Sequence, residues 1–120
     1  MMGEKVLAVI LYSNLDIEIK NLPTYESLNK TVEGYIEIIS VTINDESYDI
    51  IMNEEGKLLN LPITAFLNNG WLMDSLCGNL IISKHDDEGE MVSLTESEIS
   101  NVINYITDYL SEGTKPVFKI

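Results

Sequence analysis

The segment His85-Asp86-Asp87-Glu88-Gly89-Glu90 gathers residue types that bind metal ions or transfer protons. An EF-hand calcium loop needs oxygen ligands at alternating positions and an acidic residue six positions after its central glycine. That position holds Thr95 here, so the calcium register fails. Zinc sites use several histidine or cysteine ligands, and the chain has one of each. We therefore predict no metal and no cofactor, and we interpret the segment as a solvated acidic turn.

His85 could also act as a general base, but a base works only when a nucleophile or an acid is held against it. The sequence contains no serine nucleophile elbow, no cysteine–histidine pair and no glycine-rich phosphate loop. Pairs of carboxylates arise by coincidence among 20 acidic residues. Cys77, between Leu76 and Gly78, is predicted to be a small buried apolar residue. We therefore predict no catalytic residues and no enzymatic activity.

The charge of the chain is strongly negative. Seven basic residues, all of them lysine, stand against 20 acidic residues and give a net charge of −13. Nucleic acids are bound by clustered lysine and arginine, and arginine supplies the bidentate contacts to phosphates and guanine edges. We therefore expect no direct binding to nucleic acid and none to an anionic membrane. A negative net charge of this size favours binding to a protein with a basic surface. The alternative is that the charge only keeps the protein soluble.

Two groups of acidic residues and one tryptophan are the candidate partner-binding residues. The candidates are Asp45, Glu46, Asp49, Glu54 and Glu55 around a predicted hairpin, Asp86, Asp87, Glu88 and Glu90 in the later turn, and Trp71. Trp71 precedes Leu72 and Met73 in a predicted loop, and aromatic residues and methionine commonly anchor interfaces. The alternative is that Trp71 closes one end of the core.

Short apolar or alternating runs predict the strands that position these residues. The predicted strands span residues 5–11, 16–20, 35–43, 48–52 and 80–82. The turn residues Asn44-Asp45-Glu46-Ser47 separate two of these strands and predict a hairpin. Residues 54–57 predict a second turn.

Two short helices are predicted from their proline starts. Pro23 opens the first, in which Tyr25, Leu28 and Val32 share one face, and Gly34 is expected to end it in the left-handed conformation. Pro62 opens the second, over residues 62–67.

A longer helix is predicted over residues 97–110. Thr95-Glu96-Ser97-Glu98 has the pattern of a capping box, in which the Thr95 and Glu98 side chains bond each other's backbone amides. The helix is expected to bury four apolar residues at helical spacing, which are Ile99, Val102, Ile103 and Ile106. Tyr105 and Tyr109 either line the rim of the core or form an exposed aromatic strip.

These elements predict one α+β domain over residues 1–120. Its sheet is expected to be mainly antiparallel, with the long C-terminal helix and the short helices packed on one face. No apolar run approaches the roughly 20 residues that span a bilayer. The segment 1–5 lacks the features of a secretory leader, and a single cysteine fits a reducing cytoplasm. The oligomeric state is left open.

Several short motifs resemble a family of small proteins found in phages, prophages and conjugative elements, whose domain has no known function. The motifs are Gly34-Tyr35-Ile36-Glu37, Asn53-Glu54-Glu55-Gly56-Lys57, Leu61-Pro62 with Ala65, and Gly78-Asn79-Leu80-Ile81-Ile82. The resemblance spans residues 28–82. It implies a mobile-element accessory context, in which small acidic proteins bind and block host enzymes, including defence systems, and it supplies no catalytic residues.

The leading hypothesis is a non-enzymatic protein-binding module from a phage or mobile element. Such a module offers an acidic surface to the basic groove of a host protein, for example a nucleic-acid-handling defence enzyme. One alternative is a protein that sequesters a small molecule, although a chain with few basic residues is poorly suited to an anionic nucleotide. The other alternative is a structural or oligomerisation domain.

Overall fold

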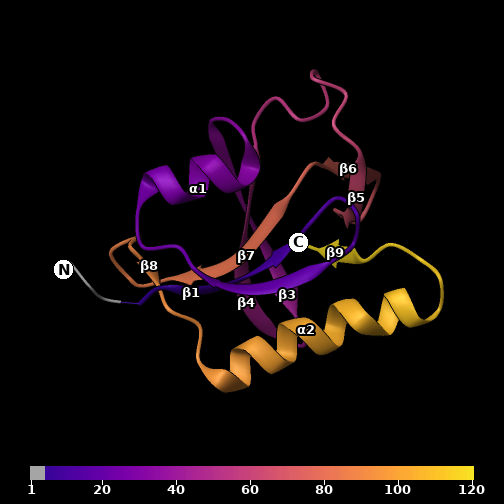
Figure 1. Cartoon of the computed structure of the whole chain (residues 1–120). Helices are drawn as coiled ribbons and strands as arrows, with labels where there is room; N and C mark the ends of the chain where they lie inside the picture. Colours follow the sequence, from indigo (N-terminus) through magenta and orange to yellow (C-terminus); the bar gives the residue numbers. More distant parts are fainter. Residues whose placement is uncertain (1–4) are drawn as a thin grey trace.

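A computed structural model of the chain describes residues 5–120 and centres on one β-sheet with a helix on either side (Figure 1). In chain order the described elements are β1 (Leu7–Leu11), β2 (Ile17–Asn21), α1 (Tyr25–Val32), β3 (Ile36–Ile43), β4 (Glu46–Asn53), β5 (Ile63–Asn68), β6 (Met73–Cys77), β7 (Leu80–His85), β8 (Met91–Val92), α2 (Glu96–Ser111) and β9 (Val117–Lys119). Residues 1–4, on which the expectation about a secretory leader largely rests, lie outside the described residues.

The strands follow the order β2-β1-β7-β4-β3-β9-β5-β6, and β8 pairs with β7. Every pairing is antiparallel except that of β5 with β9, which is parallel. β9 joins the two parts of the sheet, pairing with β3 only through Thr42 and Lys119 but with β5 over three residues. The predicted antiparallel sheet is therefore present, but it is larger than the sequence indicated.

Alternation along the central strands separates two apolar cores. In β4, Tyr48, Ile50 and Met52 belong to the core beneath α2, whereas Ile51 belongs to the core beneath α1. Figure 1 shows α1 and α2 on opposite sides of the sheet. The expectation that all helices pack on one face is therefore wrong. Consecutive apolar residues of β4 and β7 point to opposite faces of the sheet, so both faces are apolar and each is covered by a helix.

The long C-terminal helix is confirmed as α2. Thr95 and Glu98 form the predicted capping box, and α2 buries Val102 and Ile106 completely. Ile99 and Ile103 are only half-buried at the edge of this contact. Within residues 5–120, neither helix is long and apolar enough to cross a membrane.

The two tyrosines of α2 lie at the margin of the core. The ring centroid of Tyr105 lies 5.7 Å from that of Phe118 in β9 and 5.4 Å from that of Tyr109. The Tyr105 hydroxyl donates a hydrogen bond to the carbonyl of Val117, and burial raises its pKa. Tyr105 therefore lines the rim of the core and ties α2 to the last strand.

The β3–β4 hairpin is confirmed, with a turn of only two residues. Asn44 and Asp45 have φ values of 50° and 67°, as a tight turn of the mirror-image type requires. Asparagine and aspartate tolerate this left-handed backbone better than other side-chain-bearing residues do. Ile43 pairs with Glu46, so the strands continue right up to the turn.

The α+β assignment is wrong: the described chain is a mainly-β fold with two helices. Residues 62–67, predicted as a helix, instead form most of β5, which pairs with β6 and β9. Strands β6, β8 and β9 were not predicted. A short apolar run does not show whether it is helix or strand, and its partners in β9 lie 51 residues away in the sequence. The local pattern therefore could not identify this strand.

The end of α1 also differs from expectation. The left-handed residue is Glu33, with φ 64°, and not Gly34. Gly34 is required for another reason, since a Cβ atom there would lie 2.6 Å from Nδ2 of the Asn53 side chain. Asn53 donates hydrogen bonds from that nitrogen to the carbonyls of Val32 and Glu33, at 3.1 and 3.2 Å, and so caps α1 from the end of β4.

Candidate functional site

Two hairpins place six exposed acidic residues at one end of the sheet. β4 runs antiparallel to β7 with Asp49 opposite Ser83, so the start of β4 lies beside the end of β7. The acidic end, as we call it, comprises Asp45, Glu46, Asp86, Asp87, Glu88 and Glu90. The sequence placed these residues in two separate groups, and the strand pairing brings them together.

The β7–β8 turn is held by one of its own carboxylates. Oδ1 of Asp86 accepts hydrogen bonds from the backbone amides of Glu88 and Glu90, each at 2.9 Å. Gly89 adopts φ 82°, which lets the chain reverse. The side chains of Asp87, Glu88 and Glu90 are exposed. The segment is therefore an acidic turn, as expected, and it projects its charges into solvent.

The nearest cation, Lys84, is already paired. Its Nζ lies 2.9 Å from Oε2 of Glu98 in α2 and 3.3 Å from Oε2 of Glu46, and 4.6 Å above the centre of the Tyr48 ring. The hydrogen bond to Glu98 raises the pKa of Lys84, and backbone hydrogen bonding at Thr95 lowers the pKa of Glu98. With two carboxylates at its ammonium, Lys84 does not offset the remaining charge of the acidic end.

Asp49 does not belong to this exposed surface. It points to the α1 side of β4, is 5% exposed, and its Oδ2 lies 2.5 Å from Nδ1 of His85. The hydrogen bond to Asp49, followed by its charge and those of Asp86 and Asp87, raises the pKa of His85. The pair therefore links a buried carboxylate to an exposed imidazole beside the acidic turn.

Sequence reasoning missed the strand that makes this pair. β7 continues to His85, three residues beyond its predicted end, so that Ser83 and His85 lie on the same face. The run Ile81-Ile82-Ser83-Lys84-His85 does not alternate between apolar and polar residues, so no local signal in the sequence extends the strand beyond Ile82.

Glu54 and Glu55 lie far from the acidic end. They follow β4, and an eight-residue strand separates them from the hairpin turn by about 25 Å. They line a cleft of about 410 Å³ together with Ile39, Met52 and Leu76. Across its mouth the side chain of Lys57 donates a hydrogen bond to Asp74, which lowers the pKa of Asp74. The first acidic group of the sequence is thus divided between two places.

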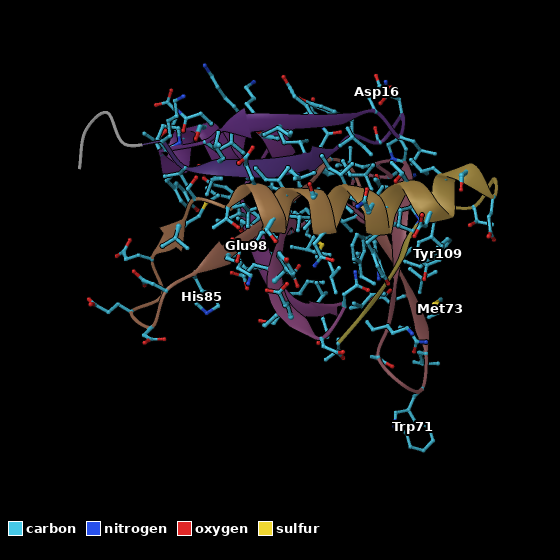
Figure 2. The ribbon with its side chains drawn as sticks, turned by 90° about the horizontal axis from the view of Figure 1, so that it is seen from below. Asp16, Trp71, Met73, His85, Glu98 and Tyr109 are labelled. Atoms are coloured by element: carbon cyan, nitrogen blue, oxygen red, sulfur yellow. The ribbon has the colours of Figure 1, made fainter. Side chains whose placement is uncertain are left out.

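Trp71 lies at the tip of the β5–β6 hairpin and is 94% exposed. The Asn69 side chain accepts hydrogen bonds from the amides of Trp71 and Leu72, which shapes the tip. Figure 2 shows Trp71 projecting from the body of the protein, well apart from His85. The interpretation that Trp71 closes one end of the core is therefore wrong, and Trp71 lies apart from the acidic end. Leu72 and Met73 are exposed beside it.

The remaining candidate residues, Cys77 and the possible metal ligands, form no reactive or metal-binding site among the described residues. Cys77 is buried, as predicted for a small apolar residue, and the carbonyl oxygen of Cys77 would lie 2.9 Å from a Cβ atom at Gly56. Within residues 5–120, no three His, Cys, Asp or Glu side chains are grouped closely enough to hold a metal ion. What the described residues offer is an exposed acidic surface, a buried polar pair next to it, and a separate cleft.

Comparison with known proteins gives one match. Residues 7–110 match the model of a protein family described as a domain of unknown function, DUF3846. No curated protein and no solved structure matches the chain. The matched region extends well beyond residues 28–82, to which the motif resemblance was confined, and it takes in every described element from β1 to almost the end of α2. The chain belongs to the DUF3846 family.

Proposed function

We propose that this chain is a small, non-enzymatic, cytoplasmic protein-binding module that engages a host protein through its acidic end. The observation that supports this proposal is the convergence of six exposed acidic residues from two hairpins. Both hairpins are tight, so the carboxylates are displayed on backbone of fixed geometry.

The charge pattern favours a basic partner. Lys84 forms ion pairs with Glu46 and Glu98, so the acidic end keeps a net negative charge. Complementary fields of this kind accelerate association and select partners by charge. Proteins that bind nucleic acid carry basic surfaces for the phosphate backbone, and such a surface is complementary to this one. The partner we propose is a nucleic-acid-handling host protein, which the module inhibits or modulates by covering its basic groove.

The proposed biological setting is a phage or other mobile element, with the partner a defence protein of the host. It is supported by the motif resemblance over residues 28–82 and by the net charge of −13. The resemblance implies small acidic proteins that bind and block host enzymes, and covering a basic surface is the mode of action we propose for this one.

A capture experiment with matched variants tests the proposal. In the acidic-end variant, Asp45, Glu46, Asp87 and Glu88 become Asn or Gln; in the control variant, Glu26, Glu33, Asp108 and Glu112 do. All eight side chains are exposed, so the two variants lose the same charge from different places. The wild type and the control should recover the same basic host protein from lysate, and the acidic-end variant should not. Equal recovery by all three contradicts the proposal.

The cleft between β3, β4 and β6 supports a second candidate function, the binding of a small molecule. Its volume of about 410 Å³ lies in the range of ligand pockets, and its walls combine Ile39 and Met52 with Asn53 and Lys57. A small-molecule ligand of this cleft raises the melting temperature, and the rise grows with the logarithm of the ligand concentration once the site is saturated. Ile39→Trp, which fills the cleft, should abolish that rise without affecting the capture experiment.

A further inference from the structure

A groove of about 280 Å³ lies on the α1 side of the sheet, next to the acidic end. Apolar side chains form its walls, namely Leu28 of α1, Ile38 of β3, Ile51 of β4 and Met91 of β8. Ile38 is 55% exposed, although Ile51, its partner in β4, is only 3% exposed. The groove is therefore the part of this face that α1 and the β7–β8 hairpin leave open.

The floor of the groove is a polar row set by strand register. Ser40 of β3 is paired with Asp49 of β4, and Asp49 is paired with Ser83 of β7. His85, two residues beyond Ser83 on the same face, extends the row toward the acidic turn. Cross-strand neighbours lie about 5 Å apart, so three acceptor-bearing side chains stand side by side.

Two groups in this row have unused hydrogen-bonding capacity. Ser83 is 1% exposed and lines the groove, and its Oγ has no hydrogen-bond partner among the described residues. Asp49 is 5% exposed, and its hydrogen bond to His85 uses only Oδ2. Buried polar atoms in folded proteins almost always have partners. A hydroxyl and a carboxylate oxygen facing one groove therefore mark a place where a donor from another molecule belongs.

We infer that the groove receives one arginine side chain of the basic partner, a step that rests on the proposed function and identifies its anchor. The guanidinium group offers five N–H donors in a plane, which suits several acceptors placed in a row. Its charge faces the carboxylate of Asp49, whose Oδ2 also contacts His85, and the acidic turn with Asp86 and Asp87 lies next to the groove. The three methylene groups of the arginine stem lie against the apolar walls.

Other occupants fit less well. An anion meets the carboxylate of Asp49 on the floor and the acidic turn at the rim. A neutral apolar group leaves the Ser83 hydroxyl and the second carboxylate oxygen of Asp49 without donors, which is costly once solvent is displaced. A lysine ammonium satisfies the charge, but as a compact point charge it reaches fewer of the acceptors than a planar guanidinium does.

The test uses n-butylguanidinium chloride as the probe and the full chain as the receptor. Backbone amide resonances of Ser40, Asp49 and Ser83 are followed by two-dimensional NMR as the probe is added. We expect saturable shifts confined to the groove, with a dissociation constant in the millimolar range. Asp49→Asn, which keeps the shape of the side chain, should weaken binding about tenfold or more, and Ser83→Ala should weaken it severalfold. Asp108→Asn, an exposed carboxylate on α2, is the matched control and should leave binding unchanged.

The outcomes separate this inference from the proposed function. Shifts that never saturate in the wild type, or that survive Asp49→Asn, contradict the groove site. Equal or tighter binding of n-butylammonium contradicts the assignment to arginine. If the groove does not bind the probe specifically but the acidic-end variant still fails to capture the partner, only the assignment of the groove as an arginine site is wrong. If the groove binds the probe but the acidic-end variant captures normally, it is the proposed function that fails.

Discussion

Oδ2 of Asp49 and Nδ1 of His85 lie 2.5 Å apart, joining a buried carboxylate of β4 to a half-exposed imidazole of β7. The contact arises because Asp49 is paired with Ser83, so that His85, two residues later, shares its face. It connects the floor of the α1-side groove to the acidic turn.

The first prediction concerns the pH dependence of this contact. Its hydrogen bond raises the pKa of His85 above the ordinary value of 6.5. The protonated ring therefore favours the folded state, and the stabilisation is complete below 6.5 and disappears as pH rises through the higher folded pKa. Melting temperatures of the wild type and His85→Asn should differ clearly at about pH 5.5 and converge at about pH 9. A gap that widens with rising pH contradicts the pairing.

The second prediction concerns Ser83. Its buried Oγ has no partner among the described residues, so removing it removes a desolvation penalty. Ser83→Ala should leave the free energy of unfolding unchanged or raise it by about 1–3 kcal/mol. Urea denaturation measures this directly, with Ser47→Ala, an exposed serine of β4, as the neutral control. A loss of stability in Ser83→Ala shows that the hydroxyl is bonded within the folded chain.

The third prediction distinguishes positions on α2. Ile106 is completely buried in the core beneath α2, whereas Ile103 is half-buried. Ile106→Ala should lower the free energy of unfolding by about 2–5 kcal/mol, and Ile103→Ala by clearly less. Ile38→Ala, on the open part of the other face, should change it by no more than about 0.5 kcal/mol. Equal losses at Ile103 and Ile106 disprove the orientation of the helix.

The fourth prediction tests the cap of α1. A Cβ atom at residue 34 displaces Nδ2 of Asn53 from the carbonyls of Val32 and Glu33. Gly34→Ala and Asn53→Ala should each cost about 1–3 kcal/mol, because both leave the end of the helix without its donor. Both substitutions remove the same interaction. The double variant should therefore lose much less free energy of unfolding than the sum of the losses in the two single variants. Full additivity refutes the shared mechanism.

The features that the sequence predicted correctly are those with local causes. Asn44-Asp45 specifies a tight hairpin turn, and Thr95 with Glu98 specifies the start of α2, because each pattern satisfies backbone groups within a few residues. β5 was misassigned, since one of its partners, Val117–Lys119, is remote in sequence, and the other, Met73–Cys77, lacks a strong strand pattern.

The candidate site depended on the same kind of remote pairing. The acidic residues could be named from the sequence, but the register of β4 against β7 decided that Asp45 and Glu46 join Asp87 and Glu88. The same register buried Asp49 beside Ser83 and separated Glu54 from both. Composition indicated that the chain is strongly acidic, and only the sheet topology indicated which surface gathers the acidic residues.

The most direct test of the account is the rate at which the captured partner associates with the acidic end. Association should be measured by stopped flow at low and high salt for the wild type, the acidic-end variant and the charge-matched control variant. Electrostatic steering predicts fast, salt-sensitive association for the wild type and the control, and slow association with a flatter salt dependence for the acidic-end variant. Association rates that are the same for all three proteins and indifferent to salt contradict the acidic end as the binding surface.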